Sequence, residues 1–289
     1  MGLRYLDYES SRGVPNIVVD GSANESTVLT LSHWPGAATP PELSRDLSAE
    51  IAFAYLDTPS AHRSVEAVTN NHLDQDGLVS VHVLVDPDLS MQHRDLLVDV
   101  AAAGDFGTYR DRRAARASMV IAAWSGDGWG YDEMLVRLVA LATDPEPYRS
   151  IWAAEDLELS ASEAAIASGR VTLGEEPDLD LAVVVVPETD ARLHPMALHN
   201  ATGCFRILLV QGRRYRYTDR YETWVQYRSR PTLARVDMGP LAAALAARDR
   251  VPWRAGSPGQ VSPTLTHEGE SALSLDDVVG AVRAHLGAA

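Results

Sequence analysis

The stretch VEAVTNNHLDQDGLVSVHVLV, residues 65–85, decides the fold expected for the N-terminal half of this chain. Its first part, Val65–Asn71, predicts a β-strand. The polar segment His72–Gly77 follows, and Leu78–Val85 then predicts a helix, although valine-rich segments also suit strands. A strand that runs through a polar turn into a helix is typical of an α/β domain.

Further strands and helices are expected on both sides of this stretch. Asn16–Asp20 and Thr27–Ser32 predict strands, and the apolar spacing over Glu42–Leu56 predicts a helix. From Asp95 to Gly169 the alanine-rich pattern is mostly helical. We therefore expect an α/β domain over residues 1–174, with a parallel sheet and flanking helices.

The second half of the chain has a different pattern. The acidic stretch Glu175–Asp180 is expected to be a linker, and the apolar run Leu181–Val186 is typical of a buried strand. Three more strands and two helices are predicted, the strands over Cys204–Val210, Arg213–Tyr217 and Tyr221–Arg228 and the helices over Pro240–Arg248 and Leu275–Leu286. This order predicts a smaller α+β domain over residues 181–289.

Composition excludes several classes of protein. The chain has 289 residues, with 25 basic and 40 acidic side chains, and its net charge of −15 argues against a general nucleic-acid coat. It contains no lysine, so mechanisms that need an amine, such as Schiff-base chemistry, are excluded. The single cysteine, Cys204, predicted to lie in the core, excludes an internal disulfide, and no disulfide-linked partner is expected. Without an apolar run of about 18 residues or a signal peptide, we expect a soluble, cytoplasmic protein with no membrane partner.

The polar turn after Val65–Asn71 carries three side chains that suit a metal ion. His72, Asp74 and Asp76 alternate, so in an extended segment they point to one side. They offer one nitrogen and two carboxylates, which suit manganese, magnesium or iron better than softer metals. An EF-hand calcium loop is excluded, because His72 occupies its first ligand position and Val83 the twelfth, where a glutamate is required. The alternative is a capped turn in which the aspartates accept backbone N–H groups.

The segment His72-x-Asp74-x-Asp76-Gly77-x-x-Ser80 resembles the first motif of the DHH phosphoesterases, a superfamily of two-domain, two-metal hydrolases. In that superfamily a strand ends in alternating His or Asp ligands, and a small residue opens the next helix. The resemblance implies a hydrolase that uses one or two manganese or magnesium ions. Over most of its length the chain also resembles bacterial proteins of unknown function.

The other DHH motifs have candidate matches at Asp20, His33 and Asp105. Their order along the chain is permuted, and the Asp-His-His motif is replaced by Ser32-His33-Trp34, which keeps only its central histidine. The resemblance implies six metal ligands, namely Asp20, His33, His72, Asp74, Asp76 and Asp105. Of these, His33, Asp74 and Asp76 are expected to take part in catalysis.

An arginine-rich strip, Arg206–Arg235, contrasts with the acidic chain. It holds eight arginines and two acids, with aromatic residues between them. Arginine pairs with phosphate oxygens and aromatic rings stack on bases, so the strip predicts binding of a small phosphorylated substrate or short oligonucleotide. The alternative is the solvent face of an antiparallel sheet, with arginines paired to acids. The part around Trp224–Arg230 resembles the accessory domain of DHH proteins, which implies that Arg228 and Arg230 bind substrate phosphate.

The other histidines carry weaker signals. His194 and His199 flank a short apolar segment and form a second possible metal pair, although no carboxylate lies with them. The remaining ones are expected to be surface or packing residues, namely His62, His82, His93, His267 and His285.

These observations favour a metal-dependent phosphoesterase that hydrolyses a phosphodiester or phosphomonoester. The alternative is a catalytically inactive DHH-like protein that binds a nucleotide or another partner, which the residues Ser32 and Trp34 favour. A metal-dependent hydrolase of another fold is the third possibility. We expect the enzyme, because all three alternating ligands of the first motif are present.

Overall fold

The computed structural model describes residues 2–187 and 192–288 of the chain, which divides into two compact units. The first unit contains the residues up to Leu157 together with the short segment Val225–Pro231. The second contains Glu158–Trp224 and the residues from Thr232 onward. Helix α8 (Arg149–Ala167) therefore begins in the first unit and ends in the second.

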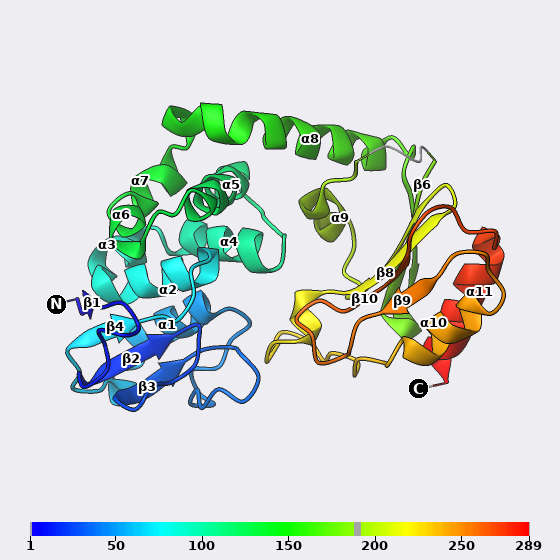
Figure 1. The fold of residues 1–289 in the computed structure, drawn as a ribbon. Coiled ribbons are helices and arrows are strands. Elements are labelled where there is room, and N and C mark those ends of the chain that lie inside the picture. The colour runs from blue at the N-terminus through cyan, green and yellow to red at the C-terminus, as the bar shows by residue number, and fades with distance from the viewer. Residues whose placement is uncertain (1, 188–191, 289) are drawn as a thin grey trace. The chain divides into compact units, whose positions relative to one another are not determined.

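The first unit is built on a parallel four-stranded sheet with the order β1-β4-β2-β3 (Figure 1). Its strands are β1 (Arg4–Tyr5), β2 (Asn16–Val19), β3 (Thr27–Leu31) and β4 (Ala67–Thr69). The central strand β2 is fully buried and pairs with β3 on one side and β4 on the other. Because the strands run in one direction, their carboxyl ends meet at the same edge of the sheet.

Helices in two successive layers pack on this sheet. They are α1 (Ser48–Leu56), α2 (Gln75–Val85), α3 (Pro87–Gln92), α4 (Arg94–Asp105), α5 (Arg112–Gly126), α6 (Tyr131–Leu135) and α7 (Leu138–Thr143). α1 and α2 contact the strands, α4 packs on both of them, and α5 packs on α4 (Figure 1). Fully buried apolar side chains such as Ile51, Leu78 and Leu97 each stabilise this packing by about 1.5–3 kcal/mol.

The second unit has a mixed six-stranded sheet with the order β5-β6-β7-β8-β10-β9. Its strands are β5 (Thr172–Glu176), β6 (Leu181–Val186), β7 (Arg206–Gln211), β8 (Arg214–Asp219), β9 (Trp253–Ala255) and β10 (Thr264–His267). Helices α10 (Gly239–Ala246) and α11 (Leu275–Gly287) cover one face, where Leu208 and Val278 lie in the core. The end of α8 and α9 (Pro195–Ala201) pack with the other face of β6, through Val184 and Leu198. Cys204 is buried in this core, as predicted.

The predicted fold class is confirmed: a parallel-sheet α/β part with flanking helices is followed by a smaller α+β part. The strands expected at Asn16–Asp20, Thr27–Ser32 and Val65–Asn71 are β2, β3 and β4. The segment Leu78–Val85 is helical, in α2, which begins at Gln75.

The prediction of a linker over Glu175–Asp180 is wrong. Glu175 and Glu176 belong to β5, which pairs antiparallel with β6, and Pro177–Leu179 form a 3-10 turn. An edge strand is held by its backbone hydrogen bonds, so its side chains can be acidic and exposed. Local acidity therefore does not distinguish an edge strand from a linker.

Two other predicted elements differ from the structure. Tyr221–Arg228 is not a strand: Tyr221–Thr223 form a 3-10 turn, and Val225–Pro231 has no regular structure and donates its backbone N–H groups to the first unit. The predicted helix over Glu42–Leu56 begins only at Ser48. Its first residues form turns instead, in which the N–H groups of Leu43 and Ser44 donate to the preceding prolines.

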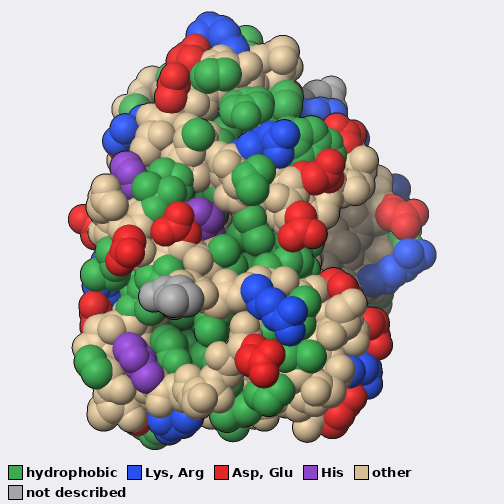
Figure 2. Space-filling model, turned by 90° about the vertical axis from the view of Figure 1, so that its left-hand side faces the viewer, with side chains coloured by type: hydrophobic (Ala, Val, Ile, Leu, Met, Phe, Trp, Pro, Cys, Tyr) green, Lys and Arg blue, Asp and Glu red, His purple; other side chains and the backbone are tan. Residues whose placement is uncertain are grey.

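The surface mixes charges of both signs. On the face shown in Figure 2, acidic and basic side chains are interspersed, and hydrophobic side chains reach the surface between them. The excess of acidic side chains therefore does not form one large acidic patch on this face. Across residues 2–187 and 192–288, no helix combines the length and the apolar character needed to cross a membrane.

Candidate metal centre

The six predicted ligands come from chain segments that end at one edge of the parallel sheet. Asp20 directly follows β2, and His33 lies two residues after β3. The turn from β4 into α2 carries His72 and Asp74, and Asp76 lies in the first turn of α2. Asp105, the last residue of α4, completes the set. The carboxyl edge of a parallel sheet is where α/β proteins bind ligands.

The structure brings these side chains together in two groups that share Asp20. The outer triad consists of Asp20, His72 and Asp74, and the inner triad of Asp20, His33 and Asp76. Within each triad the potential ligand atoms lie within 4.8 Å of one another. Asp105 adjoins the inner triad, with its Oδ2 atom 3.4 Å from His33 Nε2.

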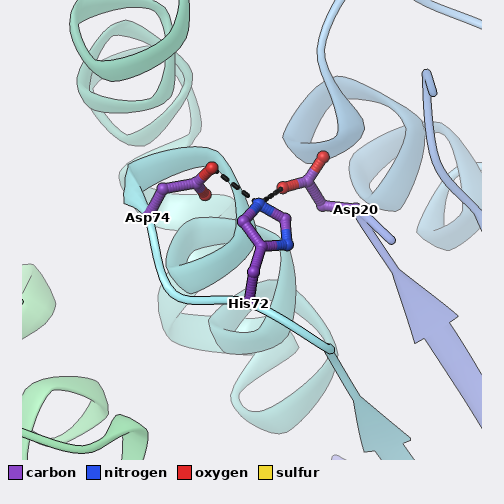
Figure 3. Close-up of side chains that lie close together, drawn as sticks. All are labelled: Asp20, His72 and Asp74. Atoms are coloured by element: carbon purple, nitrogen blue, oxygen red, sulfur yellow. Dashed lines mark hydrogen bonds and ion pairs between the residues drawn. The ribbon is translucent and has the colours of Figure 1, made fainter. Parts of the chain in front are cut away.

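Figure 3 shows the outer triad, in which His72 lies between two carboxylates. His72 Nε2 is 2.7 Å from Asp74 Oδ2 and 3.2 Å from Asp20 Oδ2. Burial lowers the pKa of His72, but these two carboxylates outweigh burial and raise it to about 10. The Trp34 ring packs on the imidazole, with ring centroids 4.9 Å apart. Trp34, which departs from the DHH motif, therefore packs on a member of the outer triad.

Asp74 also caps a helix. Its Oδ1 accepts a hydrogen bond from Gly77 N at the start of α2, which leaves Oδ2 directed at His72. Gly77 is required less for a sharp turn than for space, because a Cβ atom there would lie 2.5 Å from Asn70 Nδ2 and 2.8 Å from the Tyr131 hydroxyl. The predicted capped turn is thus present, and the same aspartate also belongs to the outer triad.

Asp20 is held between the two triads in an uncommon backbone conformation. Its φ of 43° lies in the left-handed region, which costs a non-glycine residue about 1–2 kcal/mol. Its Oδ1 accepts a hydrogen bond from Ser48 Oγ and lies 3.4 Å from His33 Nε2, whereas Oδ2 faces His72. Burial opposes ionisation of Asp20, but the two histidines outweigh burial and lower its pKa.

His33 is oriented by the backbone. Its Nδ1 lies 2.6 Å from the carbonyl oxygen of Asp46 and must donate to it, so Nε2 is the ring atom presented to Asp20, Asp76 and Asp105. Burial lowers the pKa of His33, but contact with Asp20 and the charge of Asp76 raise it to about 9. In the absence of another cation, the imidazole thus takes up a proton to balance the carboxylates.

Asp76, a residue of α2, directs its carboxylate at the first residues of α1. Its two oxygens accept hydrogen bonds from Ser48 N and Ala49 N at 2.8 and 2.7 Å, so the carboxylate caps that helix. Burial and the charge of Asp20 raise the pKa of Asp76 to about 8. Asp76 therefore joins α1 to α2 and contributes charge to the inner triad.

The charges of the cluster are unbalanced. With both rings and Asp76 protonated, the three other carboxylates and the two imidazoliums still carry −3 + 2 = −1. Asp20, His33 and Asp76 are almost fully buried, and an uncompensated buried charge costs several kcal/mol. A cluster of this composition could hold a metal ion, and its oxygen and imidazole donors match hard or intermediate divalent ions.

Sequence reasoning does not identify Ser48, which donates hydrogen bonds to both carboxylates of the inner triad, Asp20 and Asp76. Its signal is a serine at a helix start with Glu50 two residues on, whose carboxylate accepts from the N–H of Leu47. The prediction of a longer helix from Glu42 places Ser48 inside the helix and hides this signal.

The arginine strip is divided between the interior and the surface: Arg206 and Arg220 are buried, whereas four of its eight arginines are exposed. The buried Arg206 lies 3.8 Å from the Asp219 carboxylate, and the buried Arg220 pairs with Glu222. Arg235 donates to backbone carbonyl groups of a neighbouring loop. Arg206 and Arg220 thus pair with acids, as the alternative to a phosphate-binding surface expected, but in the interior and not on a solvent face.

Arg228 and Arg230 lie in Val225–Pro231 and thus belong to the first unit, the unit of the cluster. Arg228 is exposed, and its guanidinium donates to Ser44 Oγ and Gln226 Oε1, each at 2.9 Å. Binding of substrate phosphate by these two arginines stays a prediction.

His194, which with His199 forms the second possible metal site, caps a helix. His194 Nδ1 accepts a hydrogen bond from Met196 N and caps α9. Among the described residues, the two triads are the groups of three or more potential ligands with metal-ligand spacing, and neither includes His194 or His199. A metal pair at these two histidines stays a prediction.

Comparison with known proteins gives a family and no activity. No curated protein and no solved structure matches the chain significantly. A family model matches residues 1–128 and 129–278, and these comparisons do not connect the chain to the DHH phosphoesterases. With nearly the whole chain matched, this protein belongs to the family of unknown function DUF6687.

Proposed function

We propose that this protein is a metal-dependent phosphoesterase that uses one or two manganese or magnesium ions at Asp20, His33, His72, Asp74, Asp76 and Asp105. The observation that carries the proposal is the convergence of four carboxylates and two imidazoles at the carboxyl edge of the parallel sheet. These residues lie as far apart in the sequence as Asp20 and Asp105, and three of the chain segments follow different strands. The DHH resemblance, which names the same six residues, supports it.

The division of Asp20 between the triads favours two ions. One carboxylate oxygen faces His33 and the other faces His72, so Asp20 would bridge an inner and an outer ion. Two bound ions would lower the pKa of a water molecule and stabilise the attacking and leaving oxygens of an in-line displacement.

The two triads differ in exposure to solvent, and this suggests different roles for their residues. The side chains of His72 and Asp74 are 30% and 31% exposed, so a substrate would reach the cluster from the outer triad. His33 and Asp76 are buried and would act by holding the inner ion and setting the charge of the cluster. Arg228 and Arg230, in the same unit, would hold phosphate oxygens of a nucleotide, short oligonucleotide or small phosphorylated substrate.

One observation favours the second candidate, an inactive protein that binds a nucleotide or another partner. Both oxygens of Asp76 already accept backbone N–H groups, so the inner triad also has a purely structural use at the start of α1. An inactive descendant would retain Asp76 for this reason.

The test is a manganese-dependent assay of phosphate or mononucleotide release from short oligonucleotides, cyclic dinucleotides and a bisphosphate nucleotide. We expect Asp74→Ala to eliminate turnover. Asp86→Ala is the matched control, because Asp86 caps α3 as Asp74 caps α2 but belongs to neither triad. Each variant loses a helix cap worth about 1 kcal/mol, and only Asp74→Ala loses a ligand. Binding without product release, with any metal, would favour the inactive protein.

Substrate contact is tested separately. Arg228→Ala should chiefly raise KM if its phosphate contact is equal in the ground state and the transition state. An unchanged KM for every substrate that is turned over would remove Arg228 from the site.

A further inference from the structure

The segment Val225–Pro231, which we call the strap, belongs to the first unit, although the residues on both sides of it belong to the second. Gln226 N donates to the carbonyl oxygen of His33 at 2.7 Å. The Gln226 side chain donates to the carbonyl oxygen of Trp34 at 2.8 Å, and the Tyr227 ring packs on Phe106. The strap thus contacts His33, a member of the inner triad, and Trp34, whose ring packs on His72 of the outer triad.

Asp46 joins the strap to the inner triad. Its Oδ1 atom accepts hydrogen bonds from Arg228 N and from Ser229 N, the second at 2.9 Å. Its own carbonyl oxygen accepts from His33 Nδ1 at 2.6 Å. Asp46 is 9% exposed, so water competes little for these bonds. One residue therefore holds the strap with its side chain and orients the His33 ring with its backbone.

We infer that the strap, through Asp46 and Gln226, is a positioning element that keeps His33 Nε2 directed at Asp20 and Asp105 and so sets the affinity of the inner metal site. The inference rests on the proposed function, because it assumes that the inner triad binds an ion. Partners that orient a ligating histidine change metal affinity by about 10- to 100-fold when they are removed. The outer triad does not include His33, and its affinity should be independent of Asp46.

The experiment is a manganese titration of the full-length protein by calorimetry, well below the melting temperature. The inner binding event is identified as the one that Asp76→Asn abolishes. We expect Asp46→Ala, which keeps the carbonyl group that orients His33 but releases the strap, to weaken that event by about tenfold, the lower end of this range, and to leave the outer event unchanged. Asp46→Asn, whose amide oxygen can still accept from the strap, should restore most of the affinity. Such rescue and such selectivity would not result from a general loss of stability.

Two further variants complete the test. Gln226→Ala removes the side-chain bond to Trp34 and provides the test if Asp46→Ala does not fold. We expect a smaller loss than in Asp46→Ala, larger at the inner event than at the outer one. Ser44→Ala, which cuts only the side-chain contact with Arg228, is the control and should change nothing. Equal weakening of both events, or no weakening, would overturn the role of the strap while the metal site stands. Wild-type protein that binds no manganese would overturn the metal site and the strap together.

Discussion

The outer and inner triads share Asp20 and have the same ligand chemistry, yet they differ in access to water. The side chains of His72 and Asp74 are about one-third exposed, whereas those of His33 and Asp76 are fully buried. Catalytic metal sites keep a position open to solvent or substrate, and structural sites are closed. On the proposed function, substrate would therefore bind and leave at the outer triad, and the inner triad would retain an ion.

The difference has its origin in what surrounds each triad. His72 and Asp74 lie in a turn, where Trp34 packs on the imidazole. The inner residues are covered by the start of α1, through Asp76, and by the strap, through His33. The same kinds of donor atom thus differ in their exposure to water because different elements cover them.

The largest effect is expected at the residue that both triads use. Asp20→Asn should weaken both manganese binding events by about 100-fold or more, since loss of a ligand costs at least as much as loss of a residue that orients one. Asp180→Asn is the matched control, because Asp180 is the other described non-glycine residue with positive φ. Calorimetric titration measures both. Loss of only one event would show that Asp20 serves a single triad.

The next effect concerns stability. Manganese at 100 times its Kd should stabilise the folded protein by about 2.7 kcal/mol per site, and hence raise the melting temperature. Asp76→Asn should remove the inner site's share of this rise and leave that of the outer site, because it takes a buried carboxylate from the inner triad only. A thermal melt with and without manganese gives the answer. The same rise in the variant would place the metal elsewhere.

Much of the fold and the candidate site follows from local sequence. The strands β2, β3 and β4 are short apolar runs that end in polar residues, and parallel strands bring those ends to one edge. Asp20, His33 and His72 therefore meet without any long-range information beyond strand direction. Asp105 ends a helix, where no local pattern marks a ligand, and only the family resemblance indicates it.

The strap shows why the rest could not be predicted. Its alternating aromatic and arginine residues are typical of a strand, but its N–H groups donate to Asp46, 182 residues earlier in the chain. A local pattern gives the propensity of a segment and not the identity of its partner. For the same reason the arginine strip suggests an open surface, whereas Arg206 and Arg220 pair with acids in the interior.

The pH dependence of metal binding sharpens the comparison further. In the metal-free protein the pKa values of His72, His33 and Asp76 are raised, to about 10, 9 and 8, so each group holds a proton that a metal must displace. The raised histidine pKa values stabilise the metal-free fold below pH 6.5, and this stability is lost as pH rises toward 9–10. The raised pKa of Asp76 likewise makes stability fall from about pH 4 to pH 8.

Manganese should therefore bind more tightly as pH rises from about 6 to 8, by about tenfold per pH unit for each proton released. The increase in melting temperature on adding manganese should grow over the same interval. In Asp76→Asn the dependence should be shallower, because one titrating group is gone. A response that does not change with pH would mean that the metal does not displace these protons.

The smallest effect is expected from the support of the outer triad. Trp34 packs on His72 with ring centroids 4.9 Å apart, and an aromatic contact of this kind is worth about 0.5–1.5 kcal/mol. Because 1.4 kcal/mol corresponds to about tenfold in affinity, Trp34→Ala should weaken the outer manganese event by about two- to tenfold. Trp34→Phe, which keeps a ring over the imidazole, should recover part of the loss. Trp129→Ala, which removes a ring stacked on Trp124, is the matched control. The carbonyl oxygen of Trp34, which accepts a hydrogen bond from the Gln226 side chain of the strap, is kept in Trp34→Ala. Truncation of the ring should therefore spare the inner event. Weakening of the inner event instead would mean that the two triads respond as one site, and the distinction between an open and a closed triad would be lost.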